Sequence, residues 1–192
     1  MNAPFTATAS LTIADAQREM RHAYLDGAPG VLVSGFVWLV AAVVCYSQSP
    51  GHAIWTLFVG GALIHPVSVL LLKAFGRPGT HSRGNPFGVL AMATTAWMIL
   101  CLPLAYAASL VRIEWFFPAM LFVIGGRYLC FSTMYGMRLY WAFGAALALA
   151  GWGLGMTRAE PALAALSGAA IEIAFGLGIL ATMRKRQTLQ AR

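Results

Sequence analysis

The sequence predicts an all-α fold, a polytopic membrane helix bundle in which six transmembrane helices are preceded by a short amphipathic N-terminal helix. Hydrophobic residues make up 59% of the 192 residues and charged residues only 10%, whereas about 25% of the residues of a soluble domain are charged. Six apolar runs, each near the roughly 20 residues that a bilayer requires, account for most of the chain. At this length we expect one integral membrane domain spanning residues 1–192.

The first expected element is a helix over residues 10–25. Ile13, Ala16, Met20 and Tyr24 recur at helical spacing on one face, and acidic and basic residues occupy the other. Such a pattern is typical of a helix that lies on the membrane surface. The segment is too polar to be the apolar region of a signal peptide.

The six spans follow a break at residues 26–30, where Asp26 is expected to cap a helix beginning at Pro29. The breaks between later spans are rich in proline, glycine and basic residues. The predicted spans cover about residues 30–47, 53–75, 87–109, 116–136, 139–156 and 162–182.

The distribution of basic residues predicts the orientation. Ten of the thirteen lysines and arginines fall on the side that carries both termini, two fall on the other side, and Arg127 lies within a span. By the positive-inside rule both termini are cytoplasmic, in the plasma (inner) membrane. The same rule explains the basic loop 76–86, for which phosphate or lipid head-group binding is the alternative.

The net charge and its distribution also indicate which partners to expect. The net charge is +7, but the basic residues are scattered between apolar runs, so we expect membrane lipids and no nucleic acid as partners. A six-helix chain is also compatible with a homodimer.

Three ionisable residues fall near the middle of predicted spans: His65, Arg127 and Glu172 lie in the second, fourth and sixth. Such groups cost on the order of 2.5 to 3.5 kcal/mol each to insert, so they usually face the interior and have partners. Counted from the outer ends of their spans, all three lie about 15 to 18 Å deep at a rise of about 1.5 Å per residue. They therefore share one depth near the middle of the membrane.

The leading interpretation is a substrate-binding site for a small anionic solute, in a protein that transports or binds it. Arginine donates two parallel hydrogen bonds to a carboxylate, and Glu172 would be the proton-coupling group or the counter-ion. Pro66 is expected to kink the span beside His65. Three further candidates place hydroxyl groups at i, i+4 and i+7 on the arginine span: Tyr128, Ser132 and Tyr135.

Two other interpretations stay open. In the first, the protein is a structural or accessory membrane subunit, and an Arg127–Glu172 ion pair only fixes helix packing. In the second, an intramembrane enzyme uses Ser34 with His65 as its base. An enzyme is the less expected outcome because the chain lacks HExxH and GxSxG motifs.

No catalytic residue, metal site or cofactor is predicted. The chain has no cluster of histidines and carboxylates with metal-ligand spacing. Cys45, Cys101 and Cys130 lie in apolar segments without CxxC spacing, so we interpret them as small packing residues.

Five segments carry a resemblance to a known family: Ala23–Gly30, Ile64–Pro66, Gly84–Pro86, Trp115–Pro118 and Gly125–Tyr128 through Tyr135–Arg138. They resemble an uncharacterised family of small polytopic bacterial membrane proteins. The resemblance covers about residues 18–152 and implies a bacterial plasma-membrane protein, without implying an activity.

Overall fold

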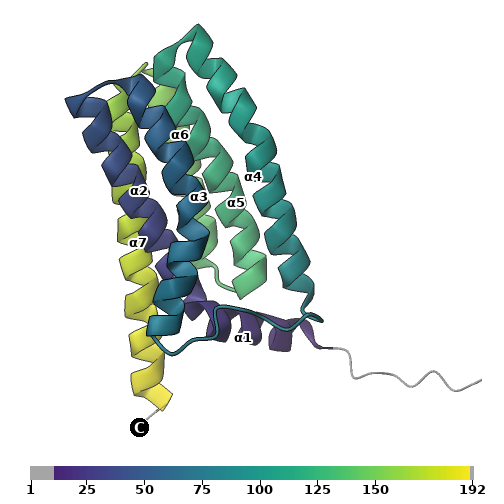
Figure 1. Cartoon of the computed structure of the whole chain (residues 1–192). Coiled ribbons are helices and arrows are strands. Elements are labelled where there is room, and N and C mark those ends of the chain that lie inside the picture. The colour runs from purple at the N-terminus through teal and green to yellow at the C-terminus, as the bar shows by residue number, and fades with distance from the viewer. Residues whose placement is uncertain (1–10, 191–192) are drawn as a thin grey trace, which may run out of the picture.

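The computed structural model describes residues 11–190, without the side chains of residues 186, 187, 189 and 190. Its helices, shown in Figure 1, are α1 (Ile13–Tyr24), α2 (Ala28–Ser47), α3 (Pro50–Ala74), α4 (Pro86–Val111), α5 (Phe116–Tyr135), α6 (Leu139–Met156) and α7 (Pro161–Gln190), with 3-10 turns η1 (Leu25–Gly27) and η2 (Ile113–Trp115). Six helices in the described part are long and apolar enough to cross a membrane, which confirms the predicted fold class. The observed bounds differ from the predicted ones by a few residues, except that α7 continues eight residues further. Ser10 and Arg192, which the predictions included, lie outside the described residues.

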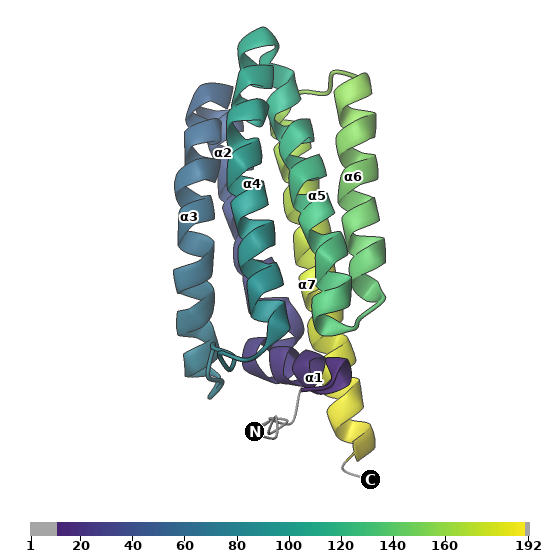
Figure 2. The same ribbon diagram turned by 90° about the vertical axis from the view of Figure 1, so that its right-hand side faces the viewer.

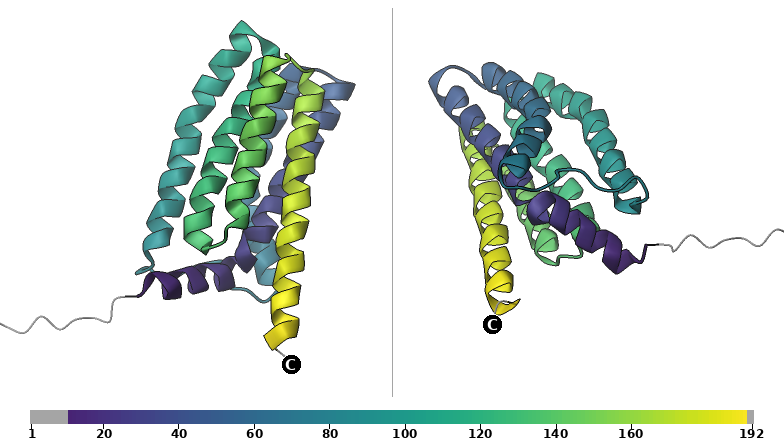
Figure 3. Two further views of the ribbon diagram at one scale, coloured as in Figure 1. Left: turned by 180° about the vertical axis from the view of Figure 1, so that it is seen from behind. Right: turned by 60° about the horizontal axis from the view of Figure 1, so that its bottom comes forward.

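The six long helices run side by side, and α1 lies across one end of the bundle (Figures 1 and 2). We call this the α1 end; the beginning of α1 and the end of α7 both lie there (Figure 2). Within the bundle, α2 packs between α3 and α7, and α5 packs between α4 and α6, while α6 also contacts α7. Figure 3 shows the same arrangement from behind and from the α1 end.

Side-chain caps and glycines fix where several helices begin and end. Ser49 and Asn85 accept hydrogen bonds from backbone N–H groups at the starts of α3 and α4, as preferred N-cap residues do. Gly136 ends α5 in the left-handed conformation, which glycine adopts without a steric cost. The prediction that Asp26 caps α2 is wrong, because Asp26 is itself left-handed within η1 and the helix begins at Ala28, after Gly27.

Close contacts between glycines bring α5 and α6 together. A Cβ atom on Gly125 would lie 2.8 Å from the Gly144 carbonyl oxygen, and one on Gly144 would lie 2.6 Å from that of Gly125. The two backbones therefore touch, as membrane helices do where small residues face each other. The α2–α7 contact is similar at Gly168, where a Cβ atom would meet the buried Trp38 ring at 2.7 Å.

The outward surfaces of α3 and α4 are apolar. Leu70 on α3 is 66% exposed, and Met92 and Leu100 on α4 are 75% and 70% exposed. In water such a continuous apolar surface would be a liability. In a bilayer the same side chains contact lipid chains, so the surface agrees with a membrane-spanning bundle.

The buried face of α1 packs on the bundle. Of the four residues expected on its apolar face, Ala16 and Met20 are buried and Ile13 is 70% exposed. Gln17 and Arg21 donate hydrogen bonds to the carbonyl groups of Thr133 and Tyr135 at the end of α5. These contacts hold α1 against the end of the α5–α6 hairpin.

The connection between α3 and α4 is attached to the other side of α1. The Glu19 carboxylate accepts hydrogen bonds from the Ser82 backbone N–H (2.6 Å), the Ser82 hydroxyl (3.0 Å) and the Asn85 amide (2.8 Å). The bond from the Ser82 backbone, followed by that from Asn85, lowers the pKa of Glu19 from its ordinary value of 4.5. Tyr24 and His81 share a further hydrogen bond of 2.8 Å.

Candidate functional site

The three predicted ionisable residues lie in the middle parts of α3, α5 and α7 but do not form one cluster. Among the described residues, the single ion pair within 4.0 Å is the surface pair of Arg18 and Asp15. Arg127 and Glu172 are therefore not in direct contact. Each has its own set of partners, and these partners belong to different helices.

Arg127 extends from α5 toward α4. Its Nη2 donates a hydrogen bond of 2.9 Å to the Thr95 hydroxyl, and its Nη1 lies 3.5 Å from the Met98 sulfur. The guanidinium carbon lies 5.3 Å from the centre of the Phe131 ring, in the range of a cation–π contact. Its Nε is buried without a hydrogen-bond partner in the described part of the chain.

The surroundings of Arg127 are less tightly packed than the other side of α5. The residue is partly exposed, and a Cβ atom on the neighbouring Gly126 would meet nothing within 4 Å. A thioether is a weak acceptor, so Thr95 supplies the one strong hydrogen bond that the guanidinium makes to described residues. Thr95 was not among the predicted site residues, although its hydroxyl group within an apolar span was a signal that could have indicated it.

Glu172 is completely buried on α7, with an exposed fraction of 0%. The Tyr128 hydroxyl points at its Oε1 from 3.5 Å, at the long limit of a hydrogen bond, and Oε2 has no partner among the described residues. The buried Ser34 of α2 lies beside this carboxyl group and the Tyr128 hydroxyl. Gly35 allows the close approach, since a Cβ atom there would lie 3.2 Å from the Glu172 Cβ.

The predicted stripe of hydroxyl groups faces away from Arg127. Tyr128, Ser132 and Tyr135 are all buried, and the two tyrosine rings stack with Tyr140 of α6. The Ser132 hydroxyl donates to the Leu129 carbonyl within its own helix, at 2.6 Å. Adjacent positions on a helix point about 100° apart, and among the described residues no hydrogen bond joins Arg127 to any of the three. Tyr128 lies beside Glu172 instead.

His65 lies apart from both charged groups. It is exposed on α3, and no hydrogen bond joins it to another described residue. Ser34 is buried between helices and faces Glu172, so the serine–histidine pair that an intramembrane hydrolase would need is not assembled. The helix continues through Pro66 from Pro50 to Ala74 without interruption.

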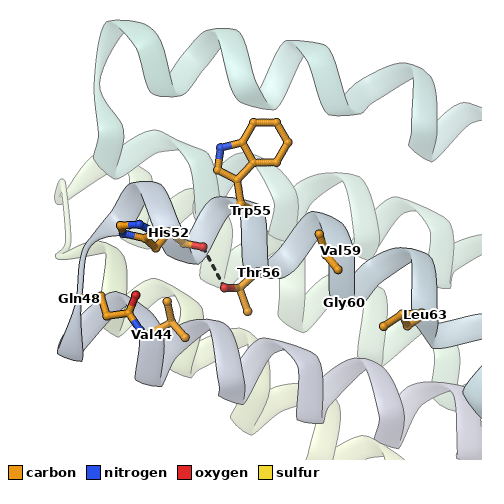
Figure 4. A pocket seen from close by; sticks show the side chains of 8 residues that line it. All are labelled: Val44, Gln48, His52, Trp55, Thr56, Val59, Gly60 and Leu63. Atoms are coloured by element: carbon orange, nitrogen blue, oxygen red, sulfur yellow. Dashed lines mark hydrogen bonds between the residues drawn. The ribbon is translucent and has the colours of Figure 1, made fainter.

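A surface groove of about 530 Å³ lies between α2 and α3, near their ends away from α1 (Figure 4). Its polar side chains are Gln48, His52 and Thr56, and the remainder is mainly apolar. Thr56 donates its hydroxyl to the His52 carbonyl within the same helix (Figure 4). None of the predicted site residues lines this groove.

A family of unknown function, DUF7010, matches residues 13–182. The chain belongs to this family. The matched range runs from α1 into α7 and contains both charged sites, and it confirms the expected membership of an uncharacterised family. No curated protein and no solved structure matched the chain.

Proposed function

We propose that the protein binds a small anionic solute at Arg127 within the membrane and moves it across together with a proton held by Glu172. One observation carries the proposal: the Arg127 guanidinium, in the middle of a membrane-spanning helix, has no carboxylate within 4.0 Å among the described residues. Its Nε is buried and has no hydrogen-bond partner within the described part of the chain. A buried charge without a partner is costly, and an anionic ligand would supply the missing charge.

The arrangement of donors suits a carboxylate. Thr95 holds one end of the guanidinium, while Nη1 meets a weakly accepting sulfur and Nε meets no acceptor among the described residues. The guanidinium therefore keeps N–H groups for the charge-assisted hydrogen bonds that arginine makes to carboxylates. Met98 and Phe131 lie beside these donors, so an apolar part of the solute would have apolar neighbours.

The same geometry weighs against the purely structural alternative. In that interpretation an ion pair between Arg127 and Glu172 fixes helix packing. The two groups instead have separate hydrogen-bond partners. Glu172 is then available as a proton carrier, because a carboxyl group buried without a cation is stable in its neutral form. Binding the solute and binding the proton would occur on opposite sides of α5.

We further propose that the α1 end faces the cytoplasm of a bacterial cell, in its plasma membrane. The basic residues on this side include Arg18, Arg21, Arg83 and Arg138. The opposite end carries Arg112 and Arg158 as its arginines. The positive-inside rule supports this orientation.

A thermal-shift experiment tests solute binding. The purified protein in lipid nanodiscs would be unfolded at constant ionic strength with acetate, benzoate, lactate or phosphate. We expect at least one carboxylate to raise the unfolding temperature of the wild type, since a ligand at 100 times its Kd stabilises by about 2.7 kcal/mol. Arg127→Gln and Arg127→Lys should abolish the shift, and Glu172→Gln should retain it but lose proton coupling in proteoliposomes.

Arg158→Gln is the matched control, because it removes the same charge from a loop outside the bundle. It should keep the full shift. A shift that persists unchanged in Arg127→Gln would rule out Arg127 as the binding group.

A further inference from the structure

A column of buried tyrosines leads from Glu172 toward the α1 end of the bundle. Tyr128 lies on α5 about two helical turns from its end, Tyr135 is the last residue of α5, and Tyr140 lies in the first turn of α6. Their exposed fractions are 6%, 5% and 0%. Three phenolic hydroxyl groups are thus buried where leucine or phenylalanine would pack as well.

The rings form a continuous stack. The centres of the Tyr128 and Tyr140 rings are 6.1 Å apart with planes inclined by 26°, and those of Tyr135 and Tyr140 are 5.4 Å apart with planes inclined by 22°. Phe131 closes one side with edge contacts to all three rings. Phe143 closes another, stacked on Tyr128 with ring centres 4.0 Å apart.

Polar groups lie at both ends of this column. At one end the Tyr128 hydroxyl points at the Glu172 carboxyl group. At the other the Tyr140 hydroxyl donates a hydrogen bond of 2.7 Å to the backbone carbonyl of Asp26, a buried acidic residue at the α1 end. Gly27 makes this end possible, since a side chain there would collide with the Tyr140 hydroxyl.

We propose that this column, from Asp26 through Tyr140 and Tyr128, is the route by which protons reach Glu172 from the α1 end. The inference rests on the proposed role of Glu172 as the proton carrier, but on no particular solute. Tyr135, which stacks on Tyr140, borders the same route.

The transfer needs no redox partner. As the Glu172 carboxylate takes the proton of the Tyr128 hydroxyl, the Tyr128 oxygen takes one from the Tyr140 hydroxyl, directly or through a bridging water, once that hydroxyl has turned from the Asp26 carbonyl. The Tyr140 oxygen then takes a proton from a hydronium ion at the α1 end, which becomes water. Each oxygen breaks one O–H bond and forms another, so one proton enters and no tyrosine stays charged. Water commonly bridges hydroxyls too far apart for direct contact.

The groups that face Glu172 favour this route over others. Tyr128 reaches it from α5 and Ser34 from α2, while α6 contributes the apolar Phe143 next to Tyr128. Arg127 is the nearest cation along α5, but it points toward α4. Ser34 lies beside Glu172 and Tyr128 themselves, whereas Tyr128 continues the stack toward the α1 end.

Time-resolved infrared spectroscopy tests the route on the full chain in lipid nanodiscs. The carboxylic acid C=O band of Glu172 is identified as the band that Glu172→Gln removes, and its rise is followed after a rapid drop in pH. We expect Tyr128→Phe and Tyr140→Phe each to slow this rise by about tenfold or more, because each removes a relay hydroxyl. Both variants keep the aromatic ring, and Tyr128→Phe also spares the hydrogen bond to Asp26.

Tyr106→Phe is the control, since Tyr106 lies on α4, is 38% exposed and is not part of the column. It should leave the rate unchanged. Wild-type rates in both Tyr128→Phe and Tyr140→Phe would overturn the route while leaving Glu172 as a proton carrier. Absence of any pH-dependent band removed by Glu172→Gln would overturn both, whereas a failure of solute binding at Arg127 would affect neither measurement.

Discussion

The two sides of α5 carry adjacent residues, Arg127 and Tyr128, in very different surroundings. On the side of Tyr128 the helix touches α6 backbone to backbone, and the aromatic rings and Glu172 are fully or almost fully buried. On the other side, Arg127 meets a hydroxyl and a thioether of α4, beside the open position Gly126. Helix α5 thus separates a closely packed side, where we propose that Glu172 holds a proton, from a more open side, where we propose that the solute binds.

The positions of Arg127 and Glu172 on different sides of α5 also change what their predicted equal depth implies. Equal depth on neighbouring helices suggested one shared site. The structure instead has a partly buried Arg127 and a fully buried Glu172 that form no ion pair with each other. In the proposed function each takes a mobile counterpart: an anion for Arg127 and a proton for Glu172.

The largest expected effect on stability is at two neighbouring glycines, one on the closely packed side of α5 and one on its open side. Gly125→Ala should destabilise the protein by about 1 to 3 kcal/mol, because its Cβ would press on the α6 backbone, which cannot move as a side-chain end can. Gly126→Ala should change stability by no more than about 0.5 kcal/mol, since its Cβ meets open space. The free energy of unfolding is measurable by titration with sodium dodecyl sulfate, and equal effects of the two substitutions would refute the contrast.

A smaller effect is expected at the α1 end, which is held by polar contacts. Glu19 has a folded-state pKa below its ordinary value of 4.5, chiefly through the Ser82 backbone N–H. Its contribution to stability is therefore present above about pH 4.5 and is lost as the pH falls toward the lower, folded-state pKa. The wild type should lose stability on acidification through this range.

Glu19→Gln provides the control for this pH dependence. The amide cannot ionise, so the variant should be less stable by about 1 kcal/mol at neutral pH and should show a weaker loss below pH 4.5. A variant with the same pH profile as the wild type would show that the contacts of Glu19 with the α3–α4 connection do not contribute.

The sequence was sufficient to predict the bundle because hydropathy and breaks act locally. Runs such as 139–156 end where proline, glycine or basic residues make a span impossible, and the structure has this helix at the same bounds. The length of α7 was underestimated, because its last turns lie beyond the apolar stretch and are helical without it.

The site was harder to predict because its partners depend on helix rotation and neighbours. Depth follows from counting residues, so Arg127 and Glu172 were correctly placed in mid-span. The groups that a side chain meets depend on how its helix is rotated and on which helices lie next to it. For this reason Tyr128 lies beside Glu172 and His65 lies on the surface. Thr95 and Ser34 became partners through contacts between helices distant in sequence, which spacing within one helix does not reveal.

A double-mutant cycle tests whether Arg127 and Glu172 act independently of each other, as the structure indicates, or as an ion pair. The free energies of unfolding of the wild type, Arg127→Gln, Glu172→Gln and the double variant would be measured under one condition. Because the two residues share no hydrogen-bond partner among the described residues, the single effects should add within about 0.5 kcal/mol. A direct buried ion pair would make each single variant lose about 3 to 5 kcal/mol by stranding its partner, and the double variant would then lose much less than their sum, which would contradict the account.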